Sequence, residues 1–127
     1  MVQAAMAEVT TLSVQQALAL HGQADVLFID IRESAEWARE GLVPGAVQAP
    51  RGVLEFWVDA TSPWHRAEFA LPPPGQPQPQ WLLYCAIGWR SALAAQMLQN
   101  MGYTNVCHLG GGFKAWQAAG GPVAQLD

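Results

Sequence analysis

The segment that decides the fold and function of this chain is Tyr84-Cys85-Ala86-Ile87-Gly88-Trp89-Arg90-Ser91. An apolar run ends at a cysteine, a short loop with one glycine follows, and an alanine-rich helical pattern begins at its end. A loop that closes onto a helix start points several unpaired N–H groups into one small volume, where the helix dipole adds positive potential. Such a place favours the ionised form of a thiol, so Cys85 is predicted to be a nucleophile.

The residues around the cysteine fit this interpretation. Gly88 can adopt a positive φ without steric cost, and Arg90 adds a positive charge close to the sulfur. We expect Ser91 to tie the helix start together, as an N-terminal hydroxyl usually does. The alternative is that Cys85 is a buried core residue at a strand end, a common position for a free cysteine.

Four segments resemble motifs of one known family. The loop from Cys85 to Ser91 is similar to the active-site loop of rhodanese-type sulfurtransferases, which reads cysteine, two variable residues, glycine, one variable residue, arginine and serine. Residues 27–33, extended by Glu36 and Trp37, resemble the family's first core strand with its Asp-x-Arg ending. Residues 41–46 and 110–116 resemble its Gly-His-Ile-Pro-Gly-Ala and Gly-Gly-aromatic-x-Ala-Trp boxes. The motifs follow the family's order, so we expect a single-domain rhodanese-like sulfurtransferase.

The resemblance implies a double displacement. The Cys85 thiolate would take the outer sulfur of a donor such as thiosulfate or another persulfide, and a thiol or cyanide would then remove it. Substrate would lie against the backbone of the loop, which consists of Ala86, Ile87, Gly88, Trp89, Arg90 and Ser91. One departure from the pattern is Leu42, which stands where the family usually has histidine, and it puts a supporting contact in doubt.

The roles of the charged residues stay open at this point. Arg90 can either hold the anionic end of a donor or brace the loop through backbone carbonyls. Asp30 and Arg32 end a strand that points toward the same edge as the loop. They can orient Arg90 or contact substrate as supporting residues, or they can form a structural ion pair.

Two other functions compete with sulfur transfer. A phosphatase or arsenate reductase is the first, but four residues separate Cys85 from Arg90. Related phosphatases have one residue more, because a tetrahedral phosphate needs a wider ring of N–H groups. The second is a non-catalytic rhodanese-fold module that binds partners. Such modules usually lack the cysteine, which this chain keeps.

Composition limits the remaining classes. The 127 residues, half of them apolar, suit one domain over residues 1–127. A net charge of −4 with a single lysine argues against nucleic acid and acidic membranes as partners. No apolar stretch is long enough to span a membrane, and two cysteines make no disulfide framework, so we expect a cytoplasmic protein. The expected partners are a small-molecule sulfur donor and a thiol or cyanide acceptor, and a sulfur-relay protein is a further option. The spacing of the three histidines predicts no metal, and no cofactor is expected.

The apolar and turn patterns predict an α/β fold, with a central parallel sheet covered by helices on both faces. Helices are expected at 11–20, 34–40, 51–59, 91–101 and 113–119, and strands at 26–31, 46–49, 81–84 and 105–109. In the helix expected at 51–59, the inner face is predicted to consist of Val53, Leu54, Phe56 and Trp57. Residues 71–80, rich in proline and glutamine, are predicted to form an extended surface connection.

Two further residues bear on function. Trp89 would make the rim of the site apolar, favouring a thiol-type acceptor over a small anion, unless it packs against Trp57 or Trp64. Cys107 lies in an apolar run and is interpreted as a core residue, with a resolving thiol as the alternative.

Overall fold

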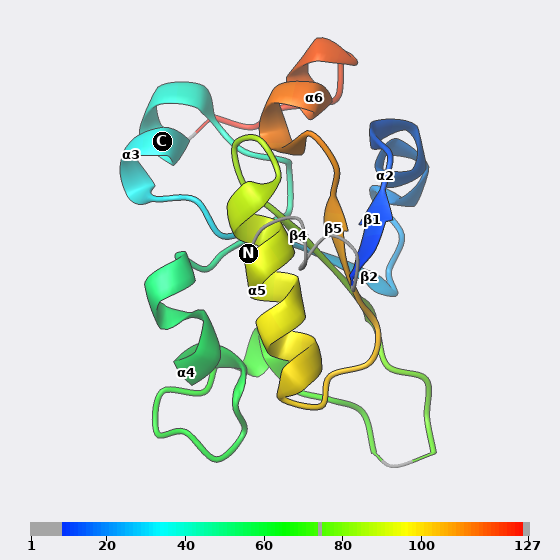
Figure 1. The fold of residues 1–127 in the computed structure, drawn as a ribbon, viewed down its shortest axis with the longest axis vertical. Helices are drawn as coiled ribbons and strands as arrows, with labels where there is room; N and C mark the ends of the chain where they lie inside the picture. Colours follow the sequence, from blue (N-terminus) through cyan, green and yellow to red (C-terminus); the bar gives the residue numbers. More distant parts are fainter. Residues whose placement is uncertain (1–8, 74, 126–127) are drawn as a thin grey trace.

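The chain folds around a five-stranded parallel sheet. The computed structural model describes residues 9–73 and 75–125, and the strand order is β1-β5-β4-β2-β3 (Figure 1). The strands are β1 (Thr10–Leu12), β2 (Val26–Asp30), β3 (Val47–Gln48), β4 (Gln80–Tyr84) and β5 (Val106–Leu109). The helices are α2 (Val14–Leu20), α3 (Ser34–Glu40), α4 (Leu54–Val58), α5 (Trp89–Asn100) and α6 (Gly112–Ala118), with short 3₁₀ turns at Arg51–Val53 and Ala67–Phe69. This is the α/β architecture that the sequence predicts.

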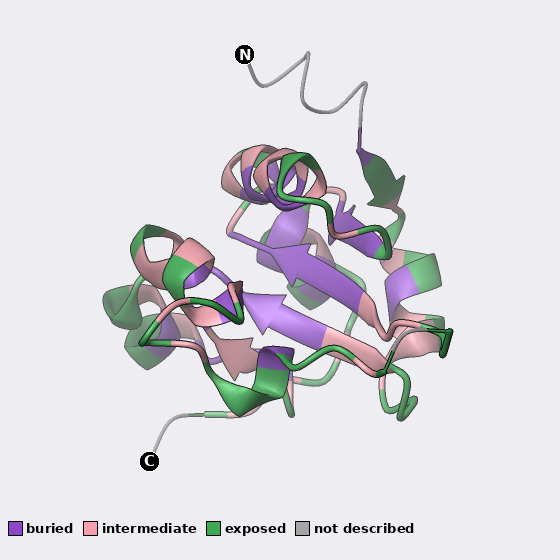
Figure 2. Cartoon of the chain, turned by 90° about the horizontal axis from the view of Figure 1, so that it is seen from below, coloured by how far each residue is buried: buried purple, intermediate pink, exposed green. Residues whose placement is uncertain are grey.

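Two apolar cores lie on opposite faces of the sheet. Leu83 and Cys85 belong to one core, together with Leu54 of α4 and Leu98 of α5. The other core contains Leu82 with residues of α2 and α6. Because successive residues of a strand point to opposite faces, β4 contributes to both cores. Figure 2 shows the consequence: the central strands are buried, and the exposed residues lie on the helices, the loops and the edge strand β1.

The central position of β4 sets the place of the site. This strand pairs with β2 over its whole length and with β5 on the other side. Its carboxyl end therefore opens between α3, which follows β2, and α6, which follows β5. Ligands of open parallel sheets bind outside the carboxyl ends of the strands. Cys85 is the first residue after the carboxyl end of β4.

The first predicted helix is wrong at its start. Residues 10–12 form β1, which pairs with β5 at the edge of the sheet, and the helix begins only at Val14 after the Ser13 cap. Ser13 and Gln16 complete a capping box, which fixes that start. The two threonines before it are β-branched and favour an extended strand.

The predicted inner face of residues 51–59 is also partly wrong. Leu54 and Val58 are buried, whereas Phe56 is exposed and forms an edge-to-face pair with Trp64. In the short helix α4 only positions four apart face the core, which places Phe56 on the outer side. The remaining elements agree with the predicted ranges within two residues, apart from the two 3₁₀ turns.

The start of α6 lies against the cysteine loop. The N–H of Phe113 donates to the carbonyl of Cys85 at 2.7 Å, and the N–H of Lys114 donates to the carbonyl of Ala86 at 3.1 Å. Gly112 has a φ of +63°, and a Cβ added there would lie 2.5 Å from the Cys85 oxygen. Only a glycine allows the two backbones to come this close.

No helix in the described parts of the chain is long and apolar enough to cross a membrane.

Gly112→Ala is expected to lower the free energy of unfolding by about 3 kcal/mol, since it combines a strained φ with a backbone clash. Gly22→Ala is the matched control: Gly22 also has a positive φ, but a Cβ there meets nothing within 4 Å. The control should lose about 1 kcal/mol from strain alone. Urea unfolding of both variants measures the difference. Equal losses would show that the close approach of α6 to the loop is not a constraint.

Candidate active site

The sulfur of Cys85 lies at the amino end of α5, inside the loop that precedes it. The residue is 1 % exposed, and its Sγ accepts hydrogen bonds from the N–H of Gly88 at 3.2 Å and of Ser91 at 3.3 Å. Gly88 caps the helix with a φ of +101°, the left-handed conformation that turns its N–H inward. Two backbone donors and the dipole of a twelve-residue helix thus act on one sulfur atom.

Arg90 is braced by a carboxylate from α3. Its two terminal nitrogens each lie 3.0 Å from an oxygen of Glu36, which makes a bidentate ion pair. The hydrogen bond from Arg90 lowers the pKa of Glu36, and the bond to Glu36 raises the pKa of Arg90. This pair joins the first turn of α5 to α3, whereas the predicted brace runs through backbone carbonyls. The choice between a brace and a donor-binding group stays a prediction. The sequence motif contains Glu36 without indicating its pairing with Arg90.

Asp30 and Arg32 form the structural ion pair. Both are fully buried, and the guanidinium of Arg32 donates to the Asp30 carboxylate and to the carbonyl of Gly41. Burial acts to lower the pKa of Arg32, but its hydrogen bond to Asp30 and the Asp30 charge outweigh it and raise that pKa. The ring of Phe113 lies 4.1 Å from the guanidinium carbon. This pair joins β2 to the loop before Leu42, and the predicted contact with Arg90 is replaced by that of Glu36.

Ser91 does more than tie the helix start together. Its hydroxyl donates to the carbonyl of Gly88, and its oxygen lies 3.6 Å from the sulfur of Cys85 and 3.1 Å from Nδ1 of His108. The other ring nitrogen of His108 lies 2.8 Å from the hydroxyl oxygen of Thr11. Burial lowers the pKa of His108, so its ring is neutral at pH 7. The spacing of His108 bears only on metal binding and does not predict this contact, because nothing in the local pattern places β5 beneath the loop.

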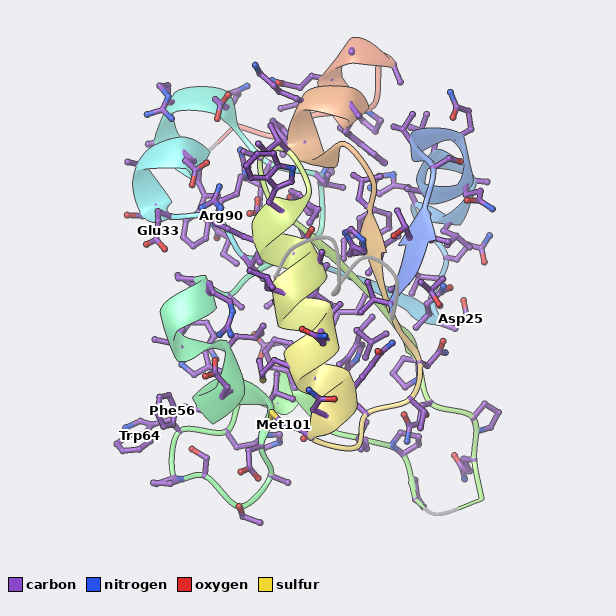
Figure 3. The ribbon with its side chains drawn as sticks, viewed as in Figure 1. Asp25, Glu33, Phe56, Trp64, Arg90 and Met101 are labelled. Carbon is purple, nitrogen blue, oxygen red and sulfur yellow. The ribbon has the colours of Figure 1, made fainter. Side chains whose placement is uncertain are left out.

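The rim of the site is apolar. Ile87 and Trp89 are both exposed, and Trp89 has 60 % of its surface in solvent. Trp64 pairs instead with Phe56 beside α4, and Figure 3 shows these two residues well away from Arg90 and Glu33 at the loop. Among the described residues, no ring contact joins Trp89 to Trp57 or Trp64, the alternative for this side chain, and the Trp89 ring is open to solvent.

Comparison with known proteins agrees with this geometry. The family model of the rhodanese-like domain matches residues 13–119. The chain belongs to the rhodanese-like domain family. Among curated proteins, human thiosulfate:glutathione sulfurtransferase is 26 % identical over 111 residues, which cover 87 % of this chain and 96 % of that protein.

Solved structures of other rhodanese-like proteins share the fold. A protein of unknown function from Rhodopseudomonas palustris, described as a possible tyrosine phosphatase, is 42 % identical with a TM-score of 0.88, covering 97 % of this chain and 90 % of its own. The polysulfide-sulfur transferase homodimer of Wolinella succinogenes is 26 % identical with a TM-score of 0.74, covering 99 % of this chain and 85 % of its own. A thiosulfate sulfurtransferase from Pseudomonas aeruginosa, at 21 % identity and a TM-score of 0.71, shares the fold over 92 % of this chain and 19 % of its own.

The structure of this rhodanese-like domain also places Cys107 and Leu42, which the sequence singles out. Cys107 is buried among the residues of the opposite core, where burial raises the pKa of its thiol to about 11. A resolving role is thus disfavoured, since its sulfur faces away from the Cys85 side of the sheet.

Leu42, at the position of the family's usual histidine, is buried and pairs with Ala124 through an isolated antiparallel bridge. Among the described residues, no group of three or more histidine, cysteine or carboxylate side chains could hold a metal ion.

Glu36→Gln is expected to lower the free energy of unfolding by about 1 kcal/mol at pH 7, the upper end for a partly exposed ion pair. The folded-state pKa of Glu36 lies below its ordinary value, so its contribution is present above the unfolded pKa and disappears as pH falls through the folded one. Denaturant unfolding at pH 7 and at about pH 3 measures this loss.

Glu55→Gln provides the control, since Glu55 forms an ion pair with Arg51, four residues before it, and has no part in the pair of Glu36 and Arg90. Its effect should stay within about 0.5 kcal/mol at neutral pH, as for other exposed helical pairs. A Glu36→Gln penalty that persists unchanged at low pH would contradict an ionic brace.

Proposed function

We propose that this chain is a sulfurtransferase that carries a sulfane sulfur as a persulfide on Cys85. It moves that sulfur from a donor such as thiosulfate or a persulfide to a thiol or cyanide acceptor. The observation that carries the proposal is the sulfur of Cys85, which accepts two backbone N–H groups at the amino end of α5. Membership of the rhodanese-like family and the similarity to a thiosulfate:glutathione sulfurtransferase support it.

In the first step the Cys85 thiolate attacks the outer sulfur of the donor. A bond forms between the two sulfur atoms, and the bond from the outer sulfur to the rest of the donor breaks. The electron pair leaves with sulfite when thiosulfate is the donor, or with a thiolate when a persulfide is. The N–H groups of Gly88 and Ser91 stabilise the anionic attacking sulfur.

In the second step an acceptor thiolate or cyanide attacks the terminal sulfur. The sulfur–sulfur bond breaks, and its electron pair returns to Cys85. The same two N–H groups now stabilise the leaving thiolate, so one set of dipoles serves both half-reactions. Splitting one transfer into two displacements is what a covalent nucleophile contributes.

The site also bears on the class of substrate. Both terminal nitrogens of Arg90 bind Glu36, so this cation is neutralised where a dianion would enter. The charge of Glu33 also acts on Arg90, which adds negative potential at the same place. Exposed Ile87 and Trp89 favour apolar contact instead. We therefore propose a thiol or persulfide substrate of low charge, or a sulfur-relay protein, as the physiological partner.

A phosphatase is the second candidate, because the similar Rhodopseudomonas protein is described as a possible tyrosine phosphatase. Two observations favour sulfur transfer. The loop has only four residues between Cys85 and Arg90, and the Arg90 fork that would bind a phosphate is occupied by Glu36. Both cysteines are free thiols, which suits a reducing compartment, and we propose the cytoplasm as the location.

Incubation of the protein with thiosulfate, or with a low-molecular-weight persulfide, should add about 32 Da to its intact mass, and cyanide should remove the addition. Cys85→Ser, which keeps Cys107, should gain nothing. Intact mass spectrometry of both proteins before and after cyanide measures this. A protein that gains no mass from either donor would overturn the proposal, and hydrolysis of para-nitrophenyl phosphate by the same protein would support the phosphatase.

Trp89→Ala should slow removal of the persulfide by an aromatic thiol such as benzyl mercaptan by about fivefold, equivalent to about 1 kcal/mol of lost contact. Removal by cyanide, which is too small to need the rim, should stay unchanged. Trp64→Ala is the matched control, because that tryptophan is as exposed but lies beside α4. Stopped-flow kinetics of persulfide removal by each acceptor, in wild type and both variants, measure the effect. Equal slowing for thiol and cyanide would contradict a rim that selects the acceptor.

A further inference from the structure

A chain of four side chains runs from the sheet edge to the nucleophile. The ring of His108, on β5, is fully buried, and its two nitrogens contact the hydroxyls of Ser91 and Thr11 at 3.1 and 2.8 Å. Ser91 in turn contacts Cys85. Thr11 is the register partner of His108 on β1, and α5 lies over β4 and β5, so the fold itself brings these groups together (Figure 1).

The hydrogen atoms of this chain can be assigned from its partners. A serine hydroxyl has one hydrogen, and that of Ser91 is donated to the carbonyl of Gly88, which can only accept. The lone pairs of Ser91 then accept from the thiol of Cys85 and from Nδ1 of His108. In this arrangement Nδ1 carries the proton of the neutral ring, and Nε2 accepts from the hydroxyl of Thr11.

Ionisation of the thiol changes one bond in this assignment. When Cys85 loses its proton to solvent, the hydroxyl of Ser91 can turn and donate to the sulfur. The Gly88 carbonyl is not left unsatisfied, because it also accepts the N–H of Ala92 at 3.2 Å. His108 keeps donating to the oxygen of Ser91, which holds that oxygen in place and makes its hydroxyl a stronger donor.

The surroundings of His108 keep it in this role. Its neighbours across the sheet are Leu83 of β4 and Thr11 of β1, and Ser91 of α5 covers it. None of these residues carries a charge, and burial is what lowers the pKa of the imidazole. A neutral ring with Nδ1 protonated is the form that can donate to Ser91 without placing a buried charge beside the loop.

We propose that His108 is a positioning residue for Cys85, which acts through Ser91 to supply a third hydrogen bond to the thiolate and to the same sulfur when it leaves the persulfide. The hydroxyl of Thr11 can donate to Nε2 and so satisfies the ring tautomer that this requires. The role in persulfide cleavage rests on the proposed function, whereas the role in thiolate stabilisation does not.

Alkylation of Cys85 by iodoacetamide across a pH series tests the proposal without any sulfur transfer, so its outcome is separate from that of the proposed function. Ser91→Ala should lower the alkylation rate at pH 7 by about tenfold, the loss expected for one hydrogen bond to a charged group. At high pH, where every thiol is ionised, the rate should recover. His108→Leu should produce the same profile, although His108 does not touch the sulfur.

The double variant separates positioning from general damage. Ser91→Ala combined with His108→Leu should be no slower than Ser91→Ala alone, because both remove one relay. His108→Asn, whose amide can replace the Nδ1 donor, should restore a rate within about threefold of wild type. Multiplying effects in the double variant, or an alkylation profile of folded His108→Leu equal to that of wild type, would overturn the proposal.

If His108→Leu does not fold, Thr11→Val takes its place in the cycle, since Thr11 is exposed and valine keeps its shape. The side chains of Ser91 and Thr11 are linked through His108. Coupling between Ser91→Ala and Thr11→Val in the alkylation rate at pH 7 then supports the relay, and independent effects overturn it.

Discussion

The close approach of α6 to the cysteine loop is the constraint on which the site depends. A loop that turns its N–H groups inward toward a sulfur must turn carbonyls outward, and those carbonyls need donors of their own. The carbonyls of Cys85 and Ala86 find them in the N–H groups of Phe113 and Lys114, at the first turn of α6. Gly112 makes this approach sterically possible. The glycine-rich segment near the carboxyl end of the chain thus completes the loop chemically, although it lies far from it in sequence.

A buried ion pair also stabilises the elements around the cysteine loop. The pair of Asp30 and Arg32 is desolvated completely, which is costly unless its hydrogen bonds are satisfied. Arg32 meets that need by donating to Asp30 and to the carbonyl of Gly41, and its guanidinium stacks on Phe113 of α6. The ion pair therefore links β2, the end of α3 and α6. It supports the elements that hold the loop, which explains why two charged residues near a catalytic edge need not contact substrate.

The sequence predicts those features of the site that depend on residues adjacent in the chain. The loop motif predicts the place of Cys85 and its N–H donors, because strand, glycine and helix start follow one another directly in the chain. The edge strand β1 is missed, since its pairing with β5 joins residues nearly a hundred positions apart. The role of His108 is missed because its contact with Ser91 depends on how α5 packs against β5, which no local pattern shows. Glu36 lies within a recognised motif, but its pairing with Arg90 depends on how α3 packs against the loop.

The source of positive potential at the sulfur has a consequence for turnover. A cation held beside Cys85 would bind an anionic donor tightly but would also retain the anionic products and the thiolate. Glu36 neutralises Arg90, so the potential comes from the N–H groups of Gly88 and Ser91 and from the α5 dipole. These dipoles are short-ranged and point at one atom. They stabilise charge on Cys85 whether it attacks or leaves, and they add little attraction for the charged groups of a substrate farther out. In the proposed reaction, an acceptor that approaches over Ile87 and Trp89 is selected by apolar contact, while the loop backbone stabilises the sulfur in both half-reactions.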